Sequence, residues 1–126
     1  VGDLVEGVDW VPTMLDYAAV QSPRFVQGRS LRAAIEGTDP APRDDILIES
    51  FHPHAPRTST VKTRTHTYHC TSTGREILYD RLADPDEGTN VVADPANAAV
   101  LSDLRRRMIL RLQRAAFNCQ ERPAAY

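Results

Sequence analysis

The segment from Asp94 to about Phe117 constrains the fold of this chain more than any other stretch. Asp94 is a good N-cap residue, and Pro95 suits the first helical position, where a missing N–H costs little. From there apolar residues recur at helical spacing and form one stripe, which consists of Leu101, Leu104, Met108, Leu112 and Ala115. A helix of this length measures about 34 Å. We expect so long a helix, with a single apolar stripe, to lie across one face of a sheet.

The middle of the chain has the patterns of short β-strands. ILIESF, residues 46–51, is apolar and β-branched, as in a buried strand. STVKTRTHTYHC, residues 59–70, alternates between two faces but is too long for one ordinary strand, so we expect a bend near residues 64–66. TSTG, residues 71–74, predicts a hairpin turn with Gly74 at positive φ, and REILYDR, residues 75–81, predicts the returning strand.

Two short helices are predicted near the N-terminus. VDWVPTMLDYAA, residues 8–19, carries apolar residues at helical spacing, and we expect Ser22-Pro23 to end it. GRSLRAAIEG, residues 28–37, has Ser30 as a fair N-cap and Gly37 as a fair residue just past the helix end. The predicted fold class is therefore α+β: a small antiparallel sheet of about four strands packed by a long C-terminal helix, with two short N-terminal helices.

Composition excludes several function classes. A chain of 126 residues with a net charge of −2 predicts one ordinary globular domain and does not indicate nucleic-acid binding. No apolar run is long enough to cross a membrane, and the start lacks both an initiator Met and the features of a signal peptide. We therefore interpret the chain as a piece of a larger protein whose localisation the sequence does not indicate. Cys70 and Cys119 fit no metal-ligand spacing, and two buried thiols are favoured over a disulfide.

The acidic stretch at residues 78–95 has two interpretations, a calcium loop or a turn. Its carboxylates do not keep the spacing of an EF-hand loop. Asp before Pro opens turns and Gly ends them, so a turn is favoured over residues 84–88, with Asn90 capping backbone groups nearby. We expect Asp86 and Glu87 to be exposed there and to contribute little to stability, whereas Leu78 and Tyr79 anchor the strand.

Four histidines, His52, His54, His66 and His69, lie near Cys70 and suggest a zinc site. His66 and His69, however, point to opposite faces of a regular strand. That geometry argues against a shared metal ion.

Four segments together resemble the C-terminal region of the sulfatase family, within the alkaline-phosphatase-like superfamily. ILYDRLADPDEGTN, followed by a final helix, is similar to the family's C-terminal signature, a Leu-Tyr-Asp-Leu segment that leads to Asp-Pro-x-Glu. VDWVPTMLDYAAV and QGRSL are similar to the family's Val-Asp-x-x-Pro-Thr helix and its Gly-x-Ser-Leu segment. ILIES resembles a family strand that ends in Glu, here Glu49. The four segments occur in the family's order and cover nearly the whole chain.

The resemblance implies a parent enzyme that hydrolyses sulfate esters with formylglycine and a divalent metal, calcium or magnesium. The family's Cys/Ser-x-Pro-x-Arg nucleophile motif is missing here, and Asp44-Asp45 precedes a strand, unlike the family's paired metal carboxylates. We therefore expect no catalytic residue, no metal ligand and no cofactor in this chain, which should be inactive alone. Residues 1–45 would be a helical segment packed on the missing N-terminal catalytic domain, and residues 46–126 would be the C-terminal sulfatase-like subdomain.

The same resemblance offers a use for the loop after the Glu-ended strand, which touches substrate in some family members. Glu49, His52, His54 and Arg57 are the candidate substrate contacts, because imidazoles and a guanidinium suit a sulfate or phosphate ester. The alternative for these residues is a polar surface loop. The expected partner is the catalytic domain, and self-association is expected when that domain is absent. The alternative is a stand-alone binding or assembly module without chemistry. The sequence does not separate a sulfatase from a related phosphate or phosphonate ester hydrolase.

Overall fold

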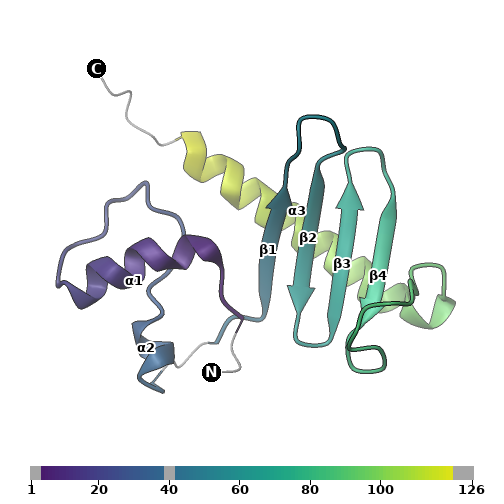
Figure 1. Ribbon diagram of the computed structural model, residues 1–126, viewed down its shortest axis with the longest axis horizontal. Coiled ribbons are helices and arrows are strands. Elements are labelled where there is room, and N and C mark those ends of the chain that lie inside the picture. Colours follow the sequence, from purple (N-terminus) through teal and green to yellow (C-terminus); the bar gives the residue numbers. More distant parts are fainter. Residues whose placement is uncertain (1–3, 39–41, 121–126) are drawn as a thin grey trace. The chain divides into compact units, whose positions relative to one another are not determined.

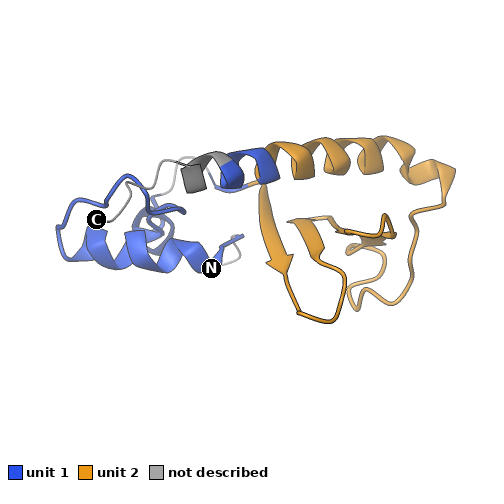
Figure 2. Cartoon of the chain, turned by 90° about the horizontal axis from the view of Figure 1, so that it is seen from above, with its two compact units in different colours: residues 1–43, 112–126 blue, residues 44–111 orange. Residues whose placement is uncertain are grey.

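The computed structural model describes residues 4–38 and 42–120, with side chains as far as Ala116. It has two compact units, shown in Figure 2. Unit 1 consists of residues 1–43 and 112–126, and unit 2 consists of residues 44–111. Within the described residues, no helix has the length and apolar character needed to cross a membrane.

Unit 2 contains the predicted four-stranded antiparallel sheet (Figure 1). Its strands follow chain order and are β1 (Asp45–Ser50), β2 (Thr58–Thr63), β3 (His66–Thr71) and β4 (Glu76–Asp80). Every connection is therefore a hairpin, as expected from the short linkers between strands. The turn before β4 contains Gly74 at a φ of 84°, which confirms the predicted hairpin turn.

Residues 98–111 of helix α3 (Ala98–Gln120), the part that belongs to unit 2, lie along one face of this sheet, as predicted (Figure 1). The pairing register places four residues in one row across the strands, which are Leu47, Val61, Tyr68 and Leu78. The last three are buried, together with three residues of the predicted helix stripe, Leu101, Leu104 and Met108. These six side chains form the core of unit 2, and the row is apolar because it faces the helix. Cys70 is a free, half-buried thiol; Cys119 lies outside the described side chains.

The segment between β4 and α3 is held by local polar contacts. Asp94 accepts a 2.9 Å hydrogen bond from the amide of Ala96 and caps a short 3-10 helix, η2 (Pro95–Asn97), that leads into α3. Asn90 Oδ1 accepts from the amide of Leu78 at 2.9 Å, and the amide of Val91 donates to the Leu78 carbonyl at 2.8 Å. The segment after β4 thus pairs with the outer edge of that strand, which would otherwise present open backbone groups.

Residues 59–70 do not form one bent strand. They form β2 and β3, joined by a tight reversal at Arg64 and Thr65. The hydroxyl of Thr63 accepts from the amides of Thr65 and His66, at 3.3 and 2.9 Å. This side chain therefore supplies the hydrogen bonds that a turn residue such as Gly or Asn would otherwise provide.

Unit 1 contains a 3-10 turn, η1 (Gly7–Asp9), and the helices α1 (Trp10–Tyr17) and α2 (Arg32–Ile35). Helix α1 is shorter than expected, because the chain leaves it through Ala19 at a φ of 55°, several residues before Pro23. A left-handed residue ends a helix without help from proline. Ser30 accepts from the amide of Arg32, so its hydroxyl serves the start of α2 although Leu31 is the boundary residue.

Polar side chains at and after the start of α1 hold the segment at residues 28–31. Asp9 Oδ1 accepts from the amide of Arg29 at 3.0 Å, and Thr13 Oγ1 accepts from the amide of Leu31 at 2.9 Å. Asp16 accepts from the Ser30 hydroxyl at 2.5 Å. The two sequence segments that resemble one family are therefore bonded to each other.

Candidate functional site

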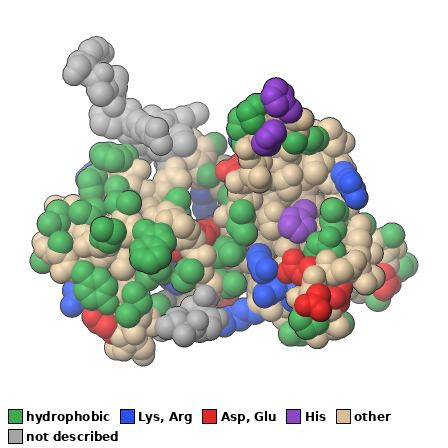
Figure 3. Space-filling model, viewed as in Figure 1, with side chains coloured by type: hydrophobic (Ala, Val, Ile, Leu, Met, Phe, Trp, Pro, Cys, Tyr) green, Lys and Arg blue, Asp and Glu red, His purple; other side chains and the backbone are tan. Residues whose placement is uncertain are grey.

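The predicted substrate contacts gather in and beside the loop between β1 and β2. This loop, residues 51–57, is exposed along its whole length. The amide of Ser72 donates to the carbonyl of Arg57 at 2.8 Å, so the loop lies beside the turn between β3 and β4. Histidine side chains stand at this end of unit 2 in Figure 3.

Within the loop the four predicted residues form two pairs. Arg57 Nη2 lies 3.7 Å from Oε1 of Glu49, which is the penultimate residue of β1. The rings of His52 and His54 meet edge to face, with centroids 5.9 Å apart. The amide of His54 also donates to His52 Nδ1 at 3.3 Å. One more residue, Phe51, joins the first pair, because the Arg57 guanidinium lies over its ring at 6.0 Å.

This arrangement has the chemistry of an anion-contacting surface and lacks that of a reaction centre. The Arg57 side chain is 66% exposed, so its remaining donors are open to a ligand. Among the described side chains, no group of three His, Cys, Asp or Glu residues is placed to hold a metal ion. The loop thus presents exposed donors of the kind that suit an anionic group, and its residues include no assembled nucleophile and base.

The other two histidines, His66 and His69, lie on strand β3. The strand register places His66 and His69 on opposite faces. His69 Nδ1 lies 2.7 Å from Thr60 Oγ1, and its ring meets that of Tyr79 edge to face at 5.7 Å. Burial lowers the pKa of His69, which keeps the ring neutral. His69 is thus a packed residue, apart from the loop.

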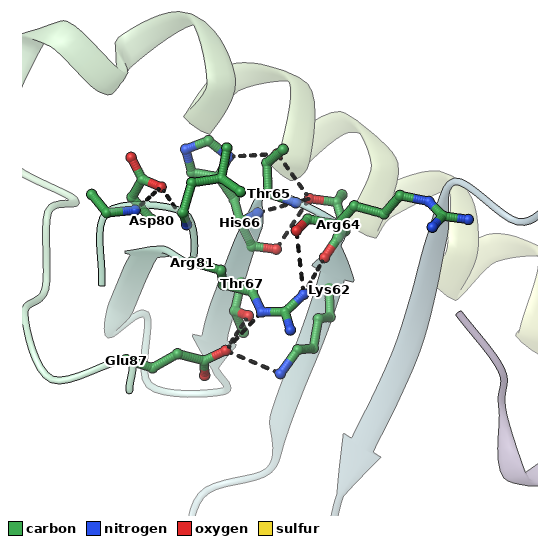
Figure 4. A network of polar contacts seen from close by, with 11 residues as sticks. Lys62, Arg64, Thr65, His66, Thr67, Asp80, Arg81 and Glu87 are labelled. Carbon is green, nitrogen blue, oxygen red and sulfur yellow. Dashed lines mark hydrogen bonds and ion pairs between the residues drawn. The ribbon is translucent and has the colours of Figure 1, made fainter. Parts of the chain in front are cut away.

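A polar network centred on Glu87 was missed by the sequence analysis (Figure 4). Glu87 Oε1 lies 3.0 Å from Lys62 Nζ, 3.3 Å from Arg81 Nε, and accepts from the Thr67 hydroxyl at 2.8 Å. Burial alone would raise the pKa of Glu87, but these donors outweigh it and the pKa is lowered. The expectation that Glu87 is an exposed turn carboxylate is therefore wrong, whereas Asp86 is exposed as expected.

The turn that carries Glu87 is formed as predicted. The amide of Glu87 donates to the Asp84 carbonyl at 3.1 Å, and Asp84 Oδ2 accepts from the amide of Thr89 at 2.7 Å. Glu87 itself has a φ of 55°, which turns its side chain back onto the sheet. Lys62 and Thr67 are cross-strand partners and offer two donors on the face opposite α3, a pairing that appears only in the folded sheet.

A second polar cluster joins the sheet to α3. Arg105 donates to both oxygens of Glu76, from Nε at 2.7 Å and from Nη2 at 2.5 Å, and the Tyr68 hydroxyl donates to the same carboxylate. Arg105 first, and then Tyr68, lower the pKa of Glu76 to about 2. Burial raises the pKa of Tyr68. This two-point ion pair fixes α3 against β4 and leaves Glu76 no capacity for acid–base chemistry near neutral pH.

A depression of about 380 Å³ lies between the β2–β3 turn and α3. Its cations are already engaged: Arg107 donates to Asp103 at 2.5 Å and to Asp45 at 3.0 Å. The depression is lined by Asp44, Thr63, Arg64, Thr65, Val100, Asp103, Leu104 and Arg107. Its balanced charges favour no particular ligand, so the loop at residues 51–57 is the better candidate site.

Comparison with known proteins gives a consistent match over most of the chain. The family model for the C-terminal part of N-sulphoglucosamine sulphohydrolase matches residues 1–114. An N-acetylglucosamine-6-O-sulfatase of Bacteroides thetaiotaomicron is 32% identical over 93 residues, which cover 67% of this chain and 17% of that protein.

Solved structures share the fold. A protein in complex with its substrate D-glucosamine-2-N,6-O-disulfate has a TM-score of 0.78 and 22% identity, over 91% of this chain and 24% of that chain. The phosphonate monoester hydrolase of Agrobacterium radiobacter has a TM-score of 0.75 and 27% identity, over 90% of this chain and 26% of that chain. The chain thus spans about a quarter or less of the length of these relatives.

Proposed function

Because the chain belongs to the C-terminal family of N-sulphoglucosamine sulphohydrolase, we propose that it supports the catalytic domain of a larger sulfuric ester hydrolase and supplies one wall of the substrate cleft. The observation that carries this proposal is the family match over residues 1–114, in a chain that spans a quarter or less of its relatives. In this proposal residues 1–45 pack on the catalytic domain, and residues 46–126 form the subdomain that carries the loop.

The exposed apolar surface of unit 1 supports the packing role. Trp10 and Met14 on α1 are 68% and 66% exposed, and Figure 3 shows apolar side chains gathered over this unit. A patch of this kind on a soluble protein marks a surface that another protein surface covers. The other large apolar side chains exposed in unit 1 are Val5, Val8, Val11, Tyr17, Val20, Phe25 and Ile35. The occupant we propose is the catalytic domain of the same enzyme.

The loop at residues 51–57 supports the cleft-wall role. Arg57 can give two parallel hydrogen bonds to a sulfate, because its carboxylate partner Glu49 lies at a loose 3.7 Å. His52 and His54 add two exposed imidazoles that donate to an anion when protonated. These residues bind and orient the ester; the bond-breaking groups come from the catalytic domain.

Two of the similar proteins act on or bind sulfated amino sugars. One relative is an N-acetylglucosamine-6-O-sulfatase, and one structural neighbour was solved with a sulfated glucosamine. We therefore propose a sulfated amino sugar as the substrate of the whole enzyme. A phosphonate monoester hydrolase shares the fold, and a guanidinium binds sulfate and phosphonate alike. Turnover of a sulfate ester must therefore be compared with turnover of a phosphonate ester.

Formylglycine and a divalent metal, calcium or magnesium, are proposed cofactors of the parent enzyme. Formylglycine would supply the nucleophile. The described part of this chain offers no three-residue ligand group, so its residues do not fit the metal, which belongs to the catalytic domain in this proposal. No step of the reaction is assigned to a metal in this chain.

The experiment that tests the proposal is expression of the complete reading frame that contains this chain. We expect a Cys/Ser-x-Pro-x-Arg motif upstream and turnover of N-acetylglucosamine 6-sulfate by the complete protein, with no turnover by the 126-residue chain. A start codon beside Val1 and no upstream motif would favour the second candidate function, a stand-alone binding or assembly module. Turnover by the chain alone would refute the supporting role directly.

A further inference from the structure

Phe51 is the one residue of the loop at 51–57 whose side chain is both large and apolar, and this side chain is exposed to solvent. It follows β1 directly and is 71% exposed. Exposure of an aromatic ring to water is unfavourable by about 25 cal/mol per Å² of apolar surface. A single exposed apolar residue is ordinary on a protein surface, so the side chains around Phe51 decide what its ring can bind.

The surroundings of this ring are cationic and polar. The Arg57 guanidinium lies over the ring at 6.0 Å, and Glu49 holds the same guanidinium at 3.7 Å. The imidazoles of His52 and His54, which contact each other edge to face, lie in the same loop. The exposed apolar residues of unit 1 are grouped with one another, whereas Phe51 stands among charged and polar side chains. Such a setting fits a small amphipathic anion better than it fits an apolar protein surface.

We propose that Phe51 is a stacking platform for the sugar ring of a sulfated monosaccharide, whose sulfate binds Arg57. This inference rests on the proposed function and names the residue that selects a sugar ester over other anions. One face of a pyranose ring presents C–H groups, which gain by leaving water for the face of an aromatic ring. The Arg57 guanidinium lies over one face of the Phe51 ring, 6.0 Å from its centroid, so the sugar would stack on the other face. The sulfur of a 6-sulfate is three bonds from the sugar ring, which lets the sulfate extend past the edge of the Phe51 ring toward Arg57.

The test is an NMR titration of the 126-residue chain with N-acetylglucosamine 6-sulfate, with N-acetylglucosamine and inorganic sulfate as separate probes. We expect saturable shifts of the backbone amides at residues 51–57, with a dissociation constant on the order of 1 mM. Phe51→Leu keeps apolar volume but no ring and should weaken binding at least about 5-fold, or about 1 kcal/mol. Phe51→Tyr keeps the ring and should bind within about 2-fold of the wild type. Leu82→Ala, at a residue 72% exposed outside the loop, is the matched control and should change nothing.

Inorganic sulfate should bind more weakly than the sulfated sugar and should not distinguish Phe51→Leu from the wild type. Equal affinity of Phe51→Leu and wild type for the sulfated sugar would overturn the proposal. So would the absence of saturable binding to the wild-type chain, or a loss in Phe51→Tyr as large as that in Phe51→Leu. The melting temperature of each variant is measured as a control, because an unchanged value shows that a loss of affinity does not come from a loss of folding. The function proposed above fails separately, if the complete reading frame has no nucleophile motif.

Discussion

Asp9 and Arg43 form a two-point ion pair inside unit 1, with Arg43 Nη1 2.6 Å from Asp9 Oδ2 and Nη2 2.9 Å from Oδ1. No part of Asp9 is exposed. Burial alone would raise the pKa of Asp9, but the hydrogen bonds from Arg43 and from the amides of Glu6 and Arg29 lower it. The carboxylate thus stays charged and joins the start of α1 to two later segments, at residues 29 and 43.

Arg43→Leu should lower the free energy of unfolding by about 3–5 kcal/mol, because it leaves a buried carboxylate without its counter-ion. Arg32→Ala is the control at the surface: Arg32 pairs with Glu36 at 2.9 Å, but both side chains are almost half exposed, so the loss should be much smaller than for Arg43→Leu. Urea unfolding followed by circular dichroism measures both. Equal losses would show that the Asp9 pair contributes no more than a surface pair.

Gly28→Ala should destabilise the chain far more than Gly74→Ala. Both glycines have positive φ, 91° and 84°, which costs an alanine about 1–2 kcal/mol. At Gly28 an added Cβ would also lie 2.5 Å from the Val8 carbonyl oxygen and 2.9 Å from Asp9 Oδ1, whereas at Gly74 it meets nothing within 4 Å. We expect a loss above about 3 kcal/mol for Gly28→Ala, measured as the shift in urea midpoint. Similar losses for both variants would argue that the close approach at Gly28 relaxes without cost.

Elements set by local chemistry could be predicted from the sequence. The apolar stripe predicted α3, because Leu101, Leu104 and Met108 repeat at helical spacing. All three are buried in the structure. Asp94 capped the start of that segment as its residue type indicates. The strand alternation predicted that His66 and His69 face opposite sides of the sheet, which the register confirms. Each of these features depends only on neighbours within a few residues.

Features that depend on distant partners could not be predicted. Glu87 and Asp86 look alike in the sequence, and only the fold shows that Lys62 and Thr67 stand opposite Glu87. Phe51 gave no signal as a site residue, because the cation over its ring comes from the other side of the loop. The early end of α1 depends on the backbone of Ala19, whose residue type does not favour positive φ.

Glu87→Ala should cost about 1–3 kcal/mol, because it removes the acceptor that Lys62 and Thr67 share and the carboxylate that pairs with Arg81, and it leaves half-buried donors unpaired. Asp86→Ala, one residue earlier and exposed, should stay within about 0.5 kcal/mol of the wild type. Thermal unfolding of the two variants under the same buffer gives the comparison. If Asp86→Ala proves as costly as Glu87→Ala, the network in Figure 4 is not what stabilises this turn.

Glu76 should give the chain a specific loss of stability in acid. Its pKa is about 2 in the folded chain and near 4.5 when unfolded. A group with a lowered folded pKa contributes stability that is complete above the unfolded pKa and is lost as pH falls through the folded pKa. The window is therefore from about pH 5 to pH 2. Glu76→Gln should remove this loss, and Arg105→Ala, which removes its largest cause, should reduce it. The measurement is the denaturant midpoint of unfolding at several pH values across that window. If the midpoint of Glu76→Gln falls with pH as steeply as that of the wild type, the acid-induced loss does not come from Glu76.

The exposed apolar surface around α1 should make the isolated chain self-associate, because the catalytic domain that we propose as its occupant is absent. Apolar patches larger than a few hundred Å² rarely stay open to water on monomeric proteins. Met14→Lys places a charge at a 66% exposed position of this surface and should shift sedimentation velocity profiles toward monomer at micromolar concentration. Leu82→Lys adds the same charge at a 72% exposed position of unit 2 and should leave association unchanged, which separates the surface from a general effect of charge. A wild-type chain that stays monomeric throughout the micromolar range would count against this surface as a docking site, since the free energy gained by covering it would then be too small to hold two protein surfaces together.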